Sequence, residues 1–194
     1  VLQIRSVEFA SKYQMPLRVL SSFNKSGGTL ITKEDNSLES AVISGITCSN
    51  DDSKIILRNV PDTPGIAAKI LSPISEAGID VDVIVQNVGS DKSTDFTFTV
   101  KNDLSEKAAK ILKDLTEGFG GGEVELVKDV SKVSVVGVGM KSHAGVAAQM
   151  FGALANKKIN IDMISTSEIK ISVVVAKDKA EEAVIALHDE FELD

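Results

Sequence analysis

The middle of the chain alternates between two patterns of hydrophobic and polar positions. In "TDFTFTV", Phe96, Phe98 and Val100 alternate with threonines, which is typical of a half-buried antiparallel strand. In "IAAKILSPI", Ile66 and Ile70 recur at helical spacing, which predicts a helix with one apolar face. The same two patterns predict strands at residues 53–60, 80–88, 94–100 and 123–129, and helices at 64–77 and 104–119.

The predicted elements follow the order strand, helix, strand, strand, helix, strand. This βαββαβ order is that of the ferredoxin-like split βαβ arrangement. The expected fold class is therefore α+β.

The sequence around Gly65 recurs 80 residues later, around Gly145. There, "TPGIAAKILSPISEAGIDVDVIVQN" aligns with "HAGVAAQMFGALANKKINIDMISTS" over 25 positions without a gap. The matching positions include Asp82 and Asp162. A constant register over this length indicates a duplicated module.

The second copy lacks its last strand. It predicts strands at 132–138, 160–165 and 169–176 and helices at 146–155 and 179–191, and no sixth element follows. The β-branched segment "SAVISGITCS" precedes the first copy and has no other role, so we expect it to supply the missing strand. The first module would then be inserted into the second, and Val42–Cys48 would pair within the second module's sheet. The expected organisation is a completing strand within 40–50, a first module at 53–129 and a second module at 131–194.

Residues 1–36 are expected to form a separate segment. "VLQIRSVEFASKY" predicts a helix, and "LRVLSSF" and "KSGGTLIT" predict two strands. These apolar pieces are too few to form a core alone. We therefore expect them to be the end of a preceding domain.

Charge and composition exclude several classes of partner. The 194 residues carry a net charge of −7, which argues against nucleic acid and anionic membranes because both attract basic surfaces. The absence of Trp removes the usual stacking platforms for bases. A single cysteine, Cys48, and the lack of a long apolar stretch favour a cytoplasmic protein without disulfides. We expect Cys48 to be a small buried hydrophobe.

The turn before the first predicted helix has the chemistry of a site for a small zwitterion. The first amides of a helix have no partner within it, and Gly65 has no side chain to keep a carboxylate away from them. Asp62 can accept hydrogen bonds from an ammonium group, and Gln86 on the next strand adds a polar contact. A free α-amino acid fits such a site. The alternative is that Pro64 and Gly65 form only a turn, which Asp62 caps.

No other group of side chains points to chemistry. His143 and His188 lie far apart in the sequence and have no cysteine cluster beside them, so a metal site is not expected. The chain contains no recognisable pairing of a nucleophile with a base. We therefore expect no catalytic residue in this chain.

Several segments resemble the regulatory region of bacterial aspartate kinase, the enzyme that phosphorylates aspartate at the start of lysine, threonine and methionine synthesis. "VPDTPGIAAKI", "VGVGMKSHAGVAA", "INIDMISTSEIKISVVV" and the ending "ALHDEFEL" resemble the paired ACT domains of that family. "LRVLSSF" followed by "GGTLIT" resembles the end of its amino-acid-kinase domain.

The resemblance implies two βαββαβ ACT domains, the first inserted into the second, whose sheets pair side by side in a homodimer and bind threonine or lysine at the interface. It also implies that the kinase domain, with its ATP and Mg, lies outside this chain, so no cofactor is expected here. Carried over by motif position, the effector-binding residues are Asp62, Gly65, Ile66, Ala67, Asp80, Val81, Asp82 and Gln86 in the first module and Met140, Lys141, Val146, Ala147, Asn160, Ile161 and Ser167 in the second. The second turn has Ser142 and Ala144 where the first has Asp62 and Pro64, which weakens the argument for ammonium binding there.

Two functions remain open at this point. The first is the allosteric regulatory region of aspartate kinase, also made as a separate subunit from an internal start. The second is a free-standing pair of ACT domains that senses amino acids and regulates another protein. The kinase-like segment near the N-terminus favours the first. RNA binding by a ferredoxin-like sheet is disfavoured by the acidic charge and the few aromatic residues.

Overall fold

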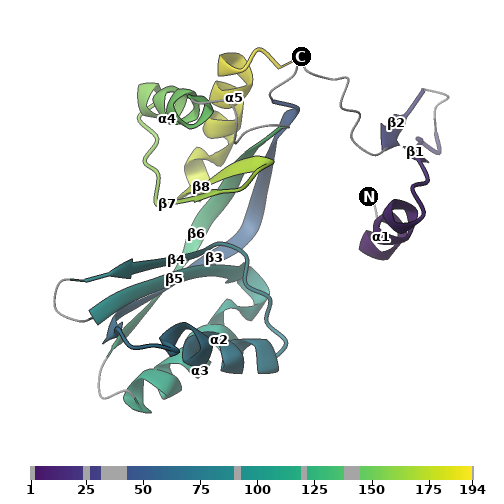
Figure 1. The fold of residues 1–194 in the computed structure, drawn as a ribbon. Helices are drawn as coiled ribbons and strands as arrows, with labels where there is room; N and C mark the ends of the chain where they lie inside the picture. Colours follow the sequence, from purple (N-terminus) through teal and green to yellow (C-terminus); the bar gives the residue numbers. More distant parts are fainter. Residues whose placement is uncertain are drawn as a thin grey trace. The chain divides into compact units, whose positions relative to one another are not determined.

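The structure is a computed structural model that describes residues 3–23, 27–31, 43–89, 93–118, 122–137 and 145–193. The chain divides into two compact units, residues 1–40 and 41–194. The larger unit contains both copies of the sequence repeat (Figure 1).

The smaller unit consists of one helix and a two-stranded antiparallel sheet. Helix α1 spans Ile4–Lys12, and strand β1 (Leu17–Val19) pairs with β2 (Thr29–Ile31). Among the side chains described in this unit, Ala10 alone is a buried hydrophobic residue. Large apolar side chains of the unit lie exposed instead: Phe9, Tyr13, Met15, Leu20, Phe23 and Leu30.

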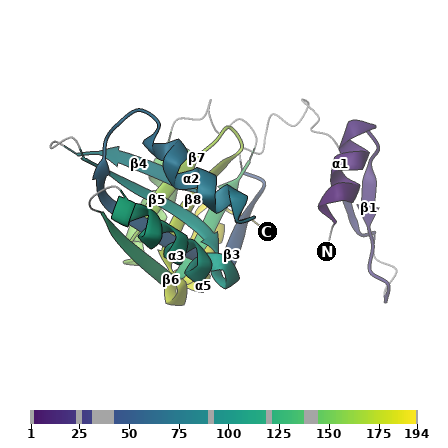
Figure 2. The same ribbon diagram turned by 90° about the horizontal axis from the view of Figure 1, so that it is seen from below.

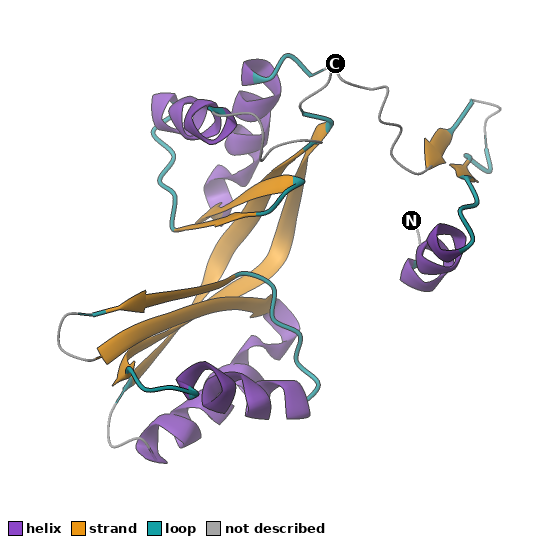
Figure 3. Cartoon of the chain, in the orientation of Figure 1, coloured by secondary structure: helices purple, strands orange, loops and turns teal. Residues whose placement is uncertain are grey.

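The larger unit is built on one antiparallel sheet of six strands in the order β4-β5-β3-β6-β8-β7. Its two central strands are long: β3 spans Gly45–Pro61 and β6 spans Glu123–Val136. They run side by side through both lobes of this unit, and the helices lie at its two ends (Figures 1 and 3). The two modules therefore share these strands.

Each module completes its βαββαβ order on one end of the shared strands. The first module adds α2 (Ile66–Glu76), β4 (Ile84–Val88), β5 (Ser93–Lys101) and α3 (Asn102–Gly118). The second adds α4 (Val146–Asn156), β7 (Met163–Thr166), β8 (Lys170–Ala176), the 3-10 turn η1 (Lys177–Lys179) and α5 (Ala180–Glu190). Seen from below, α2 and α3 lie in front of the sheet (Figure 2).

The expected insertion of the first module into the second is present. Residues Gly45–Ser49 of β3 pair with Lys132–Val136 of β6, in the second module's sheet. Asp52–Pro61 of the same strand pair with β5, in the first module's sheet. Val42 lies outside the described residues. The sequence predicted separate strands on either side of residue 50, whereas β3 is continuous and only its register with β6 shifts, between Ser49 and Lys54.

Each module has its own apolar core between its helices and the sheet. The first core includes Ile55, Leu57, Ile70, Phe96, Phe98 and Leu112, and the second includes Val133, Val135, Met150, Leu154, Val173 and Leu187. The predicted inward positions Phe96 and Phe98 are confirmed.

A third, smaller apolar cluster joins the two modules on the opposite face of the sheet. It consists of Val83, Met163, Val130 and Val174. Along β6, Val130 alternates with Val133 and Val135, which face the helices, so the cluster lies on the face that the helices leave open. Thr99 on β5 is also buried, although the alternation of the sequence predicts an exposed position.

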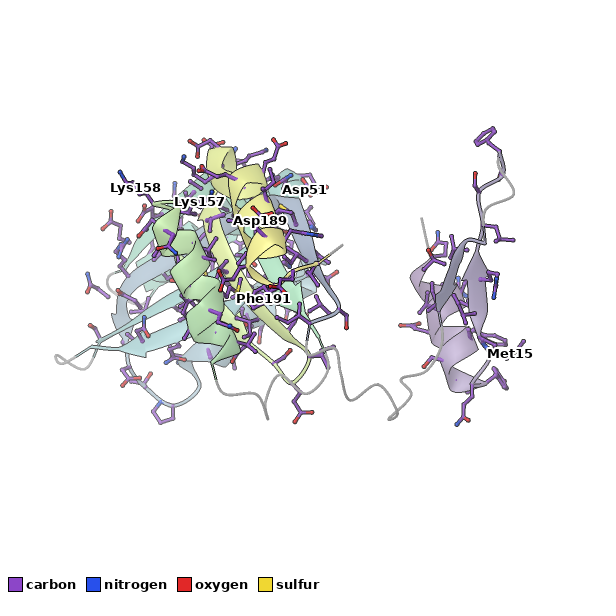
Figure 4. All side chains as sticks on the ribbon, turned by 90° about the horizontal axis from the view of Figure 1, so that it is seen from above. Met15, Asp51, Lys157, Lys158, Asp189 and Phe191 are labelled. Atoms are coloured by element: carbon purple, nitrogen blue, oxygen red, sulfur yellow. The ribbon has the colours of Figure 1, made fainter. Side chains whose placement is uncertain are left out.

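The first helix of each module ends in the same way. In α2 the amides of Gly78 and Ile79 donate to the carbonyls of Ser75 and Ile74, and Gly78 has a φ of 72°. These two hydrogen bonds, together with the left-handed residue that follows the helix, form a Schellman motif. In α4 the equivalent left-handed position is Lys158, with a φ of 56°. Lys157 and Lys158 lie together at the end of that helix (Figure 4).

Several local predictions need correction. Helix α2 begins at Ile66 rather than at Pro64, because the left-handed Gly65 interrupts the helical backbone. Strands β4 and β7 begin at Ile84 and Met163 rather than at residues 80 and 160. Cys48 is exposed rather than buried, and its Sγ lies 3.3 Å from Oδ1 of Asn50.

Candidate functional site

The candidate site begins at the turn between β3 and α2. The Thr63 amide donates to the carbonyl of Pro61 at 3.0 Å, and the Ile66 amide donates to that of Thr63 at 3.1 Å. Gly65 is the N-cap of α2 and has a φ of 89°, a conformation that favours glycine. A Cβ placed on Gly65 would meet no atom within 4 Å apart from those of Gly65 and its chain neighbours, so the space beside the helix start is open.

The second module opens its first helix with the same geometry. Gly145 is the N-cap of α4, with a φ of 110°, and a Cβ on it would also meet nothing within 4 Å. The sequence repeat is therefore also a repeat of backbone conformation at the candidate site. Met140 and Lys141 lie outside the described residues.

The side chains that follow the two glycines point into the molecule. Ile66 and Val146 are buried members of the two cores. Ala67 and Ala147 are half-buried and pack against the same cores. A ligand at these positions would therefore meet backbone amides of the first helical turn, which have no partner within the helix; in α2 the amide of Ile66 is already bonded to Thr63, so the amides that follow it are the ones on offer.

The structure separates the predicted residues of the first module into two groups. Gly65 follows the end of β3, where Pro61 pairs with Ser93 of β5. The end of β4 lies at the same end of the sheet, on the other side of β5, because Val88 pairs with Thr94. Gln86 thus lies toward the same end of the module as the turn that holds Asp62, which is half-buried.

Asp80, Val81 and Asp82 lie at the other end of the module. The amide of Asp82 donates to the carbonyl of Thr99 at 3.1 Å, far along β5 from Thr94. Six residues of extended chain from Asp82 to Val88 span about 20 Å. One amino acid therefore cannot contact both Asp62 and Asp82 of the same chain.

The second module shows the same division. Asn160 and Ile161 precede β7, and the amide of Asp162 donates to the carbonyl of Val174 at 2.8 Å. Ser167 lies at the opposite end of β7, where its amide bonds the carbonyl of Lys170 at 2.8 Å. Its hydroxyl also accepts a bond from the amide of Lys170, so Ser167 closes the turn between β7 and β8.

Two lysines that the sequence analysis did not single out meet the aspartates of this site. Nζ of Lys54 lies 2.5 Å from Oδ2 of Asp162, and Lys132 forms an ion pair with Asp82. Each lysine follows a serine at the start of its module's first strand, in the repeated dipeptide "SK". That repeat was visible, but only the fold shows that the pairs cross between modules.

A buried carboxylate lies at the junction of the modules. The side chain of Asp52 is 5% exposed and accepts a bond of 2.9 Å from Nζ of Lys101. Burial alone would raise the pKa of Asp52, but hydrogen bonds from Ser49 and Lys101 and the charges of Lys101 and Lys132 lower it below its ordinary value.

A hollow of about 410 Å³ opens on the face of the sheet without helices. Lys54, Ile56 and Arg58 of β3 form one wall, and residues 161–164 of the second module form another. Arg58 is paired with Glu125 at 2.8 Å, so its charge is already balanced. The ion pair between Lys54 and Asp162 joins these two walls.

Within the described part of the chain, the side chains offer no cluster of three or more His, Cys, Asp or Glu residues that could hold a metal ion. No helix among the described residues is long and apolar enough to cross a membrane. The side chain of His188, near the end of α5, lies 3.2 Å from the carbonyl of Leu193.

The two modules belong to a known class of regulatory domain. Residues 55–117 and residues 133–191 each match the family described as the ACT domain. The chain thus contains two ACT domains that share one antiparallel sheet.

Relatives of the whole chain identify the kind of protein. Aspartate kinase of Pseudomonas fluorescens (strain SBW25) is 57% identical over 195 residues, which cover 100% of this chain and 47% of that protein. The regulatory subunit of aspartate kinase from Thermus thermophilus is 41% identical, with a TM-score of 0.74, over 77% of this chain and 99% of that subunit. Aspartokinase III of E. coli in complex with lysine and aspartate shares the fold, with a TM-score of 0.74 at 20% identity over 98% of this chain and 42% of that one.

This chain belongs to the aspartate kinase family and corresponds to its regulatory region with two ACT domains. It spans about half the length of the curated relatives that it matches.

Proposed function

We propose that this chain senses threonine, lysine or both, and feedback-inhibits an aspartate kinase that starts lysine, threonine and methionine biosynthesis. The observation that carries the proposal is the repeated helix start: Gly65 and Gly145 hold the same left-handed conformation beside open space. Helix amides offer a site for the carboxylate of an amino acid. Asp62 offers one for its ammonium group.

The proposed site is completed by a second copy of the chain. Asp62 and Gly65 lie at the end of the sheet where edge strand β4 ends, and Asp80 and Asp82 precede the start of β4 at the opposite end. If the edge strands of two copies run antiparallel beside each other, each copy brings its own half of the site to the other's missing half. Ile84 on β4 and Ile164 on β7 are equivalent exposed apolar residues on the two edges, which favours such contacts.

The kinase reaction itself is proposed to take place outside this chain. The exposed apolar side chains of the unit at residues 1–40, such as Phe9, Tyr13 and Met15, would be covered by the rest of a kinase domain. That domain would hold ATP and Mg in the cytoplasm, and this chain would hold no cofactor. The alternative, a free-standing ACT pair that regulates another protein, leaves these apolar residues without a role.

Inhibition would operate by linkage. An effector that binds one arrangement of the paired ACT domains more tightly shifts the kinase toward that arrangement, and aspartate and ATP affect effector binding reciprocally. A differential binding energy of about 1–3 kcal/mol is enough for regulation. A ligand held between two chains supplies it, since rearrangement of the chains breaks the site.

The test is titration calorimetry of the 194-residue chain with threonine, lysine, methionine and aspartate in turn. We expect heat from threonine or lysine, and its loss in Asp62→Ala and Gln86→Ala. Asp114→Asn, an exposed carboxylate on the outside of α3, is the matched control and should bind normally. Sedimentation with and without the bound amino acid should show a dimer. Binding that survives in both site variants would contradict the proposed site. The absence of binding heat from all four amino acids would contradict the sensing function.

A further inference from the structure

The two cross-module ion pairs are related by the internal repeat. Lys54 and Lys132 follow Ser53 and Ser131 at the start of the first strand of each module. Their partners, Asp162 and Asp82, are the equivalent residues of the aligned segments. Each lysine therefore pairs with the aspartate of the other module, and the internal repeat relates the two ion pairs to each other.

The lysines are well placed to hold these contacts. The side chains of Lys54 and Lys132 are 11% and 16% exposed, whereas those of their aspartate partners are more accessible. A lysine that is largely covered has few other positions for its ammonium group. Each aspartate is thus held by a cation whose own position is fixed by the partner module's strand.

The backbone around each aspartate is also fixed at one point. The amides of Asp82 and Asp162 bond the carbonyls of Thr99 and Val174, on the third strand of their own modules. Directly after them come Val83 and Met163, which meet in the apolar cluster between the modules. The segments 80–82 and 160–162 are therefore tied to both modules at once.

We propose that these two ion pairs are a latch that couples the modules: Lys132 positions segment 80–82 and Lys54 positions segment 160–162, so that the conformation of each segment depends on the other module. This inference rests in part on the proposed function, because both segments hold proposed effector-binding residues. A ligand that moves Asp82 would act on Lys132 and hence on the first strand of the second module. Binding in one module would thereby alter the site of the other.

The two arms of the latch are not equivalent. Lys132 also acts on the buried carboxylate of Asp52, which Lys101 holds from the other side. At the other arm the hollow beside Lys54 and Asp162 leaves room for that pair to separate. We expect the pair of Lys54 and Asp162 to open more readily.

Amide hydrogen exchange of the full 194-residue chain without ligand tests the latch. Lys132→Met keeps the apolar stem and removes the charge. It should speed exchange at residues 80–83, in the other module, by roughly two- to fivefold and leave residues 160–163 unchanged. Lys54→Met should do the reverse. Asp162→Asn serves as the second variant for that arm if Lys54→Met does not fold.

Lys128→Met is the matched control. Lys128 lies on β6 like Lys132, but its partner Glu106 at 2.6 Å belongs to the same module. It should leave both segments unchanged. Faster exchange only on the mutated strand, or equal changes in the control, would overturn the proposal.

A second experiment, with ligand, distinguishes the latch from the proposed function. With threonine or lysine bound, the wild-type chain should show altered exchange in both segments, and Lys132→Met should restrict the change to one module. Failure of both amino acids to bind the wild type would count against the proposed function, while the exchange without ligand would still decide whether the latch exists. Identical ligand responses in wild type and Lys132→Met would contradict the coupling.

Discussion

Asp52 and Val130 lie directly opposite each other on the two central strands, although they hold equivalent positions in the two modules. The symmetry of the repeat is broken there by one buried charge. On the other side of its strand, Asp52 pairs with Lys101 of β5. On the other side of β6, Val130 pairs with Ala176 of β8. The first module therefore holds an ion pair where the second holds two apolar side chains.

The acid stability of the protein should depend on Asp52. Because its folded-state pKa is lowered from an ordinary value of 3.8, the unfolded chain takes up the proton first as the pH falls. The stabilisation is therefore complete above that ordinary value and is lost as the pH falls through the lower folded-state pKa. We expect Asp52→Asn to lower the free energy of unfolding by about 1–2 kcal/mol at neutral pH. It should also reduce the loss of that free energy as the pH falls into the acid range.

Urea unfolding at a series of pH values measures this effect. Asp51→Asn is the control, since Asp51 is exposed on the same strand and should change stability by less than about 0.5 kcal/mol at every pH. Equal pH dependence in wild type and Asp52→Asn would show that the carboxylate does not contribute.

The left-handed Lys158 should be a site of easy stabilisation. A residue with a Cβ is disfavoured there by roughly 1 kcal/mol relative to glycine, and the equivalent residue of α2 is Gly78. We expect Lys158→Gly to raise the free energy of unfolding by about 0.5–1 kcal/mol. Calorimetric melting measures the change.

The neighbouring lysine supplies a control for that substitution. Lys157 has a φ of −89°, which any residue adopts. Lys157→Gly should therefore lower stability by about 0.5–1 kcal/mol, because glycine only adds freedom to the unfolded chain. Stabilisation by both substitutions, or by neither, would mean that backbone conformation is not the cause.

The two modules should unfold together rather than one at a time. The central strands β3 and β6 run through both, and the apolar cluster around Val83 and Met163 joins them. We expect Leu112→Ala, which opens the first core, to cost about 2–5 kcal/mol and to lower the melting of both modules equally. Hydrogen exchange in β8 and β5, followed separately during urea unfolding, distinguishes the modules.

Lys113→Ala is the surface control on the same helix and should change stability by less than about 0.5 kcal/mol. Earlier exchange in β5 than in β8 for Leu112→Ala would show that the modules unfold independently.

Much of the fold could be predicted because it is encoded locally. The alternation of Phe96, Phe98 and Val100 and the spacing of Ile66, Ile70 and Ile74 mark the core faces, and all six are buried. The insertion could also be predicted, since a second module without its last strand requires one from elsewhere. The sequence signal failed where conformation rather than hydrophobicity decides, as at Gly65, which moves the helix start past Pro64.

The candidate site was predicted only in part. The chemistry of the turn indicated Asp62 and Gly65, and the resemblance added Asp80 and Asp82, but neither showed that the two pairs lie at opposite ends of the module. It also did not supply Lys54 and Lys132, because no sequence pattern shows which charges meet across two modules.

The sequence by itself determined the two modules, their βαββαβ order and the recurrence of a glycine close to the start of each first helix. The order and the glycines follow from hydrophobic period and the backbone freedom of glycine, which act within a few residues, and the duplication follows from the constant register of the repeat. Tertiary structure alone decided that the modules share two continuous strands and that Asp52 is buried at their junction. It also decided that Lys54 and Lys132 each pair with an aspartate of the other module. Such contacts join residues up to 108 positions apart, as between Lys54 and Asp162, and depend on how the strands pair and on which face each side chain points.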